Sequence, residues 1–244
     1  MAIAFDNIAS NTTPATTLSI NPGAAAGSTI IAVVCNDSAS SVTFTWPSGF
    51  TELLNQLCAS SDGGSVGIAI KNSASGSEGS LDITSSQAMI GYMVSFSGCD
   101  TTTPLDITPP AAVVNTTQTA PPLVIDTNTI TPVTNGAMIF GVRMTDVGAS
   151  ESKPCTFSTL SGTTGSWNSP ARDYNSGFYN VNGGWAPQTT AGSVVVRTST
   201  SGAANAAGVA WGLALRPAGA GGSGAGRLVE GNLVNGSLIG SLAA

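Results

Sequence analysis

Histidine is absent from the sequence, and charged residues are scarce. Only 8% of the 244 residues are Asp, Glu, Lys or Arg, whereas about 25% is usual for a soluble domain. Without histidine, the chain cannot assemble a Ser-His-Asp or Cys-His nucleophile or a His-ligated metal site. These absences exclude the commonest hydrolytic and zinc-dependent active sites.

Long apolar runs and basic clusters are missing as well. No segment reaches the roughly eighteen consecutive apolar residues of a membrane-spanning helix. Residues 1–10 have neither the basic nor the apolar region of a secretory signal. The net charge is −6 and the cations are scattered, which disfavours binding to a phosphate backbone. We therefore expect no membrane insertion and no nucleic-acid partner.

Helical periodicity is also lacking, because Gly, Pro, Asn, Ser and Thr interrupt the chain at short intervals. Between them lie short runs rich in β-branched residues, which are typical of strands. The wholly apolar run Ile30–Val34 predicts a strand covered on both faces. The sequence predicts an all-β, jelly-roll-like antiparallel β-sandwich. The clearest predicted strands are Thr29–Val34, Val42–Thr45, Val66–Lys71, Ser80–Thr84, Met89–Phe96, Ala137–Met144, Val194–Thr198 and Val209–Leu215.

Three segments recur in the same order later in the chain, which indicates an internal duplication. We expect one sandwich over residues 1–217, built from related halves at about 1–100 and 123–217 and joined by a Thr/Pro-rich connection. Neither half alone covers both faces of its sheet, so we favour one domain over two. The corresponding pairs are Gly27–Val34 with Gly136–Arg143, Gly79–Thr84 with Gly192–Arg197, and Ala88–Phe96 with Ala207–Leu215.

A short tail follows a Gly/Ala/Ser linker at 218–226, and the tail at 227–244 repeats a five-residue unit with paired apolar residues. Adjacent side chains of an extended chain point to opposite sides, so one chain cannot bury both members of a pair. We expect the tail to become ordered against a partner, either further copies in a homotrimer or a neighbouring protein. The alternative is a disordered terminus. The predicted assembly residues are Leu228, Val229, Leu233, Val234, Leu238 and Ile239.

The remaining polar chemistry is sparse. The cysteines, at positions 35, 58, 99 and 155, have no metal-ligand spacing, so free core thiols are expected, although a Cys35–Cys58 disulfide stays open. The carboxylates mostly follow turn signals, which favours turn and cap roles over a catalytic pair. Oxygen ligands for a cation could come from Asp126, Asn128 and Asp146, but without the spacing of a calcium loop. We expect no cofactor and no catalytic residues.

Aromatic side chains gather in residues 166–187, together with Asn, Asp and Arg. Aromatic faces beside such groups can bind a sugar by stacking and hydrogen bonding. The alternative is that these aromatic residues alternate along a strand and pack into the core. The candidate glycan or receptor surface consists of Trp167, Arg172, Tyr174, Tyr179 and Trp185.

Four short stretches resemble a β-sandwich module that recurs in virion proteins of tailed bacteriophages. Gly27–Val34 is similar to the family's Gly-x-x-Ile-x-Ala-Val-Val strand, and Trp46–Leu53 to its Pro-x-Gly-Trp/Phe-Thr turn and strand. Tyr92–Leu105 resembles its aromatic-x-Gly-x-Asp-x-x-x-Pro segment, and Val209–Ala218 its closing strand. The second half departs from the turn motif and carries Ser161–Thr163 instead.

The resemblance implies a virion setting, assembly in the host cytoplasm and no catalysis. We therefore expect a non-enzymatic structural protein, a capsid decoration or head-fibre protein exposed on the particle, which assembles as a homo-oligomer and contacts other virion proteins through its tail. The alternative is a tail-fibre or adhesin subunit, or a carbohydrate-binding module, that recognises a host surface glycan. A depolymerase is disfavoured because clustered carboxylates are missing.

A reducing cytoplasm keeps thiols free, so we predict four free cysteines. Titration with a thiol reagent under denaturing, non-reducing conditions should find four reactive groups per chain. A titration that finds no reactive group would refute the prediction.

Overall fold

The computed structural model describes residues 1–58, 63–118, 122–146, 155–168, 174–175, 179–200 and 206–219. These residues form strands and no helix, and they contain no helix long and apolar enough to cross a membrane. All the strand pairs are antiparallel. The predicted fold class, an all-β antiparallel sandwich, is therefore confirmed, while the tail at 227–244 lies outside the described residues.

The first half builds one long sheet in the order β1-β6-β2-β5-β4, with β3 also paired to β6. The two long strands β1 and β6 bend together, with register shifts between Asn11 and Thr17. Beyond the bend, Thr17–Ile20 and Leu81–Thr84 join β3 in an outer layer. The strands are β1 (Ala4–Ile20), β2 (Thr29–Asn36), β3 (Phe44–Thr45), β4 (Phe50–Leu57), β5 (Ser65–Lys71) and β6 (Leu81–Ser97).

The second half repeats this arrangement with described strands that form two sheets. Its inner sheet has the order β11-β12-β9-β14-β7, and a separate outer sheet has the order β10-β13-β8. Thus β7 and β8 stand where β1 runs in the first half, and β14 and β13 stand where β6 runs. The strands are β7 (Val113–Gln118), β8 (Leu123–Asp126), β9 (Ala137–Asp146), β10 (Cys155–Ser161), β11 (Tyr174–Asn175), β12 (Tyr179–Gln188), β13 (Val195–Thr200) and β14 (Ala206–Leu215).

The same aromatic contact recurs in both halves between the outer and inner layers. A Cβ at Gly67 would lie 2.5 Å from the Phe44 ring, and a Cβ at Gly184 would lie 2.8 Å from the Phe157 ring. Each phenyl ring therefore rests on a glycine of the inner sheet. The outer layers carry Phe44 on β3 and Phe157 on β10, which supports the structural equivalence of the two halves.

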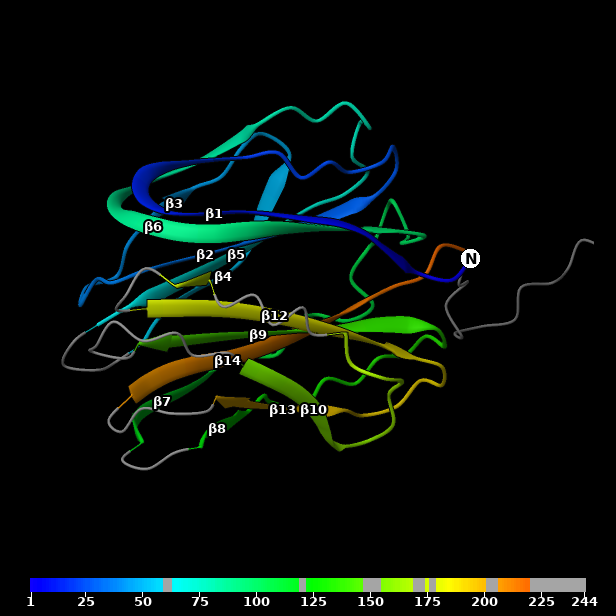
Figure 1. The fold of residues 1–244 in the computed structure, drawn as a ribbon. Coiled ribbons are helices and arrows are strands. Elements are labelled where there is room, and N and C mark those ends of the chain that lie inside the picture. Colours follow the sequence, from blue (N-terminus) through cyan, green and yellow to red (C-terminus); the bar gives the residue numbers. More distant parts are fainter. Residues whose placement is uncertain are drawn as a thin grey trace, which may run out of the picture.

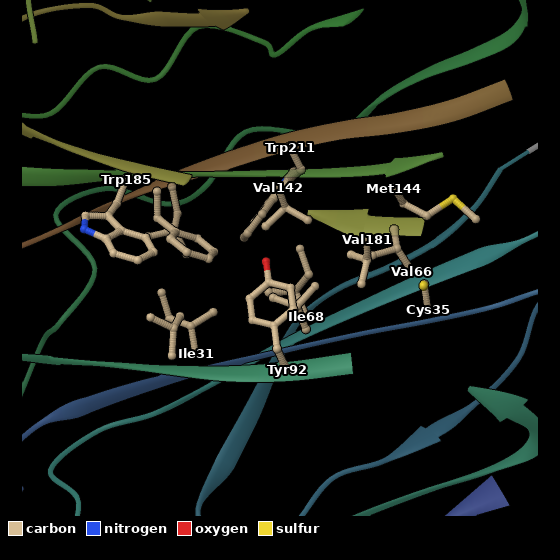
Figure 2. Packing of buried hydrophobic residues seen from close by; sticks show 14 of the residues in the cluster. Ile31, Cys35, Val66, Ile68, Tyr92, Val142, Met144, Val181, Trp185 and Trp211 are labelled. Carbon is tan, nitrogen blue, oxygen red and sulfur yellow. The ribbon is translucent and has the colours of Figure 1, made fainter. Parts of the chain in front are cut away.

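The two inner sheets pack face to face and enclose a central core, so the molecule has four layers (Figure 1). Along β2, Ile31 and Val33 face this core while Ile30 and Ala32 face the outer layer of the first half. Figure 2 shows Tyr92 of the first half directed towards the sheet of the second half. A Cβ at Gly183 would overlap the Tyr92 hydroxyl, so glycine is needed at this contact.

All four cysteines are free and buried. Burial raises the pKa of the Cys58 and Cys155 thiols to about 12 and that of Cys99 to about 11. Burial also raises the pKa of the Cys35 thiol. The thiolate is the reactive form, so these side chains serve as small apolar groups of the core.

The central core predicts that the first half alone is not a stable domain. A chain of residues 1–110 would expose side chains worth about 1.5–3 kcal/mol each when buried, against a total stability of about 5–15 kcal/mol for a domain. We expect no cooperative unfolding transition by calorimetry, whereas the full chain should give one. A cooperative melt of the fragment would mean that the halves are independent. The exposed residues would be Ile31, Val33, Ile68, Tyr92, Val94 and Phe96.

Candidate functional site

A groove of about 700 Å³ lies where the first half meets the connection between the halves. Its walls come from β4, from β5 and the residue that follows it, from the connection, and from Arg216 just after β14. Segments more than a hundred residues apart in the sequence therefore converge here. The lining residues are Thr51, Glu52, Leu53, Ile70, Asn72, Thr103, Pro104, Leu105, Asp106, Ile107, Thr108, Pro109 and Arg216.

One wall of the groove belongs to an edge strand. β4 ends the sheet order of the first half, and among the described strands it pairs with β5 alone. The register shifts between Glu52 and Leu54, so the strand is irregular where it lines the groove. An edge strand presents N–H and C=O groups that can pair with an added strand. The groove is thus suited to an extended peptide that lies beside β4.

The base of the groove is held together by the carboxylate of Asp106. One of its oxygens accepts hydrogen bonds from the backbone N–H groups of Val133 at 2.7 Å and Thr134 at 2.9 Å. The other accepts from Nε of Arg216 at 3.2 Å. Arg216 also donates to the Thr103 hydroxyl at 3.0 Å and to the Asp106 carbonyl at 3.2 Å.

This network ties the connection to the end of β14 and to the segment before β9. Burial would raise the pKa of Asp106, but the hydrogen bonds from Thr134, Val133 and Arg216 outweigh it and hold the pKa below its usual range. The carboxylate is therefore ionised and fully bonded at neutral pH. Its role is to hold the groove in shape.

Glu52 and Asn72 also line the groove. The carboxylate of Glu52, a residue of β4, accepts a hydrogen bond from the indole Nε1 of Trp46 at 2.7 Å, and this bond fixes its position. The side-chain oxygen of Asn72 is buried and receives no hydrogen bond. An incoming peptide N–H or side-chain donor could satisfy this oxygen.

The aromatic residues proposed as a glycan surface do not share a face. Tyr179 and Trp185 are each only 4% exposed and belong to the central core. Trp185 stacks on Phe5 with the ring centres 4.7 Å apart. The interpretation of these two residues as a binding surface is wrong, because alternation along β12 turns them towards the first half.

The other members of that set lie elsewhere. Trp167 is half-buried, stacks on Phe157 at 5.9 Å and donates from Nε1 to the Thr159 hydroxyl at 3.0 Å. Arg172 lies outside the described residues, and of Tyr174 only the backbone in β11 is described. The predicted assembly residues of the tail also lie outside the described part of the chain.

The residues considered for a cation are separated or already bonded. Both carboxylate oxygens of Asp126 accept hydrogen bonds from Arg197, at 2.8 and 2.9 Å. Asn128 donates to the Ala111 carbonyl, while Asp146 is buried at the end of β9. Within the described ranges, no group of three or more His, Cys, Asp or Glu side chains could hold a metal ion.

The sequence does not predict the groove, because its parts are far apart in the chain. The sequence pattern indicates a connection in the Thr/Pro-rich stretch and a closing strand over Val209–Ala218, but not that they meet. The available signal was the scarcity of charge: Asp106 and Arg216 are two of very few charged residues in their regions. Comparison with protein-family models, curated proteins and solved structures finds no match for this chain.

Replacing the buried carboxylate tests the role of this network. We expect Asp106→Asn to lower the free energy of unfolding by about 1–3 kcal/mol at pH 7, because it breaks hydrogen bonds to a buried charge. Asp126→Asn, which breaks a more exposed ion pair, should cost less than about 1 kcal/mol. Urea denaturation of both variants measures the difference, and equal losses would contradict the proposed role.

The same substitution should change the dependence of stability on pH. The pKa of Asp106 is lower in the folded state, so its contribution is present above the unfolded pKa and is lost as pH falls through the folded pKa. The Asp106→Asn variant should lack this part of the acid destabilisation. Its stability should therefore approach that of the wild type as pH falls, and a constant difference would contradict the assignment.

Proposed function

We propose that this chain is a non-enzymatic structural protein of a tailed-phage virion, a capsid decoration or head-fibre protein that assembles in the host cytoplasm and is exposed on the particle. The groove beside β4 carries the proposal. Three of the four stretches that resemble the phage module contribute to its lining. They are Trp46–Leu53, Tyr92–Leu105 and Val209–Ala218.

The Gly-x-Asp-x-x-x-Pro part of that resemblance has a structural reason. Gly98 has a φ of 75°, which a residue with a side chain rarely adopts. The Asp100 carboxylate accepts hydrogen bonds from the backbone N–H groups of Thr102 and Thr103, both at 2.9 Å. The carbonyl of Pro104 then accepts from the N–H of Arg216 at 2.7 Å. The motif therefore shapes the groove wall.

We assign the groove to the tail of a neighbouring copy, residues 227–244. Arg216 lines the groove, so the tail leaves the sandwich close to it. The linker at 218–226 has a root-mean-square span of about 15–18 Å if it behaves as a flexible Gly-rich chain. The tail has the apolar pairs that an extended strand could place against Leu53, Leu105 and Ile107.

Exchange of tails between copies would close a homo-oligomer, of which the predicted trimer is one form. Each copy would donate one tail and accept another, so the ring closes without an unpaired groove. On the particle, the same tail could contact a neighbouring virion protein. Low charge and many hydroxyl groups suit a rigid, inert surface module.

Deletion of residues 227–244 tests this assignment. We expect the shortened chain to keep the circular dichroism and melting temperature of the sandwich but to lose its oligomeric mass in light scattering and its incorporation into particles. Unchanged mass and incorporation would show that the tail has no such role.

A change in the groove should act in the same way. Thr51→Lys places a charge on the edge strand, which disfavours strand addition, and should lower the oligomeric mass. Ser158→Lys, on the exposed face of β10, is the matched control and should not. A protein that oligomerises equally in both variants would locate the interface elsewhere.

Immunogold labelling of purified phage particles tests the setting. Label along the head supports a decoration or head-fibre protein, whereas label at the tail tip supports the adhesin alternative. Glycan-array binding that is lost on Trp167→Ala would support a carbohydrate-binding module instead. Particles without label would overturn the virion proposal.

A further inference from the structure

A buried cation lies between the inner and outer sheets of the second half. Arg143 on β9 is 1% exposed. Its Nε donates to the Thr145 hydroxyl at 3.0 Å, and its Nη1 donates to the Thr198 hydroxyl of β13 at 3.3 Å. The side chain therefore occupies the space between the two sheets and does not reach the central core.

The described residues offer Arg143 no counter-ion. No carboxylate in the described part of the chain forms an ion pair with it, and Asp146 lies beside Met144 near Gly64, on the opposite face of β9. Burial lowers the pKa of the guanidinium to about 10, which leaves it charged at neutral pH. The thiols of Cys58 and Cys155 are close enough to influence it, but their pKa of about 12 keeps them neutral.

Several polar groups around the Arg143 side chain have no hydrogen-bond partner. A guanidinium has five N–H groups, and two of those of Arg143 donate the hydrogen bonds described above. On the neighbouring strand, Asn182 lies directly opposite Arg143, and Asn180 opposite Thr145. Both amides are almost fully buried, and neither their nitrogen nor their oxygen atoms have a hydrogen-bond partner.

The backbone on the other side leaves room for the charged group. A Cβ at Gly208 of β14 would lie 3.0 Å from both Nε and Nη2 of Arg143. Glycine therefore lets the strand pass beside the guanidinium. At the opposite end of the same layer, the space is filled by apolar residues such as Ile139 and Val196.

We propose that this chain binds a small inorganic anion, a halide or an oxyanion, between the Arg143 guanidinium and the amides of Asn180 and Asn182. A buried charge without compensation costs several kcal/mol, and hydroxyl groups alone do not neutralise it. An anion satisfies both the charge and the unused N–H donors. The ion is a structural component of the second half, independent of the groove.

The asparagine opposite Arg143 provides a sharp test. Asn182→Asp changes almost no volume but supplies a carboxylate beside the guanidinium. This variant should no longer need the ion. Asn135→Asp is the matched control, because Asn135 is exposed and its Oδ1 accepts a hydrogen bond from the Ala191 N–H that a carboxylate can also accept.

The experiment compares melting temperatures after dialysis into sodium gluconate, whose bulky organic anion serves as the reference. Sodium bromide and sodium sulfate are then added at constant ionic strength. We expect the wild type and Asn135→Asp to melt at higher temperature in one or both salts. Asn182→Asp should melt higher than both in gluconate and gain less than both from the added salts, because only the general stabilising effect of sulfate remains.

Crystals of the wild type soaked in bromide or selenate locate the ion directly and distinguish a halide from an oxyanion. Anomalous density within hydrogen-bonding reach of Arg143 supports the proposal. The proposal is overturned if neither soak gives density there, or if Asn182→Asp responds to the salts as the wild type does. The soak needs no variant, so a variant that fails to fold does not affect it.

Discussion

The face-to-face packing of the two inner sheets is the contact on which the rest of the molecule depends. Strands such as β2 and β9 are buried on both faces, so each inner sheet needs cover on two sides. One side is supplied by the other half and one by the outer layer of the same half. Four layers follow from this requirement, without any helix in the described residues.

The two halves meet this requirement differently. In the first half, β1 and β6 continue through a bend and supply both layers, so inner and outer layer are covalently continuous within each strand. In the second half, the described strands form two sheets, an inner one and an outer one. Arg143 and its neighbouring amides lie between these two sheets.

Much of the strand pattern could be predicted from the sequence, because runs of apolar and β-branched residues reflect burial. The run Val66–Lys71 is nearly all of β5, and Ile30–Val34 is covered on both faces as expected. Most of the long strand β1 was not predicted, and only its end near Thr17–Ile20 carries a strand pattern, because many of its other residues are exposed and polar. Ser80–Thr84 and Met89–Phe96 proved to be one strand, because the pairing with β1 carries β6 through the intervening Ser and Gln residues.

Sites were harder to predict than strands. The groove depends on segments that meet only in three dimensions, and the direction of Trp185 depends on strand register rather than on composition. Arg143 lay inside a predicted strand as a single charge among apolar residues. That pattern was the available signal for a buried cation, but the lack of a counter-ion among the described residues becomes visible only when β12 and β13 are placed beside it.

The place where the chain leaves the sandwich determines how the fold would respond to mechanical load. After β14, the chain is bound to the segment that follows β6 by three backbone hydrogen bonds, from Ala218 to Gly98, from Asp100 to Arg216 and from Arg216 to Pro104. A force applied along the chain after β14 loads these three hydrogen bonds together in shear, before the force reaches the sheets. A protein held by its tail would therefore transmit force into the seam between its halves, and this clamp, rather than the core, would set the force at which it begins to open.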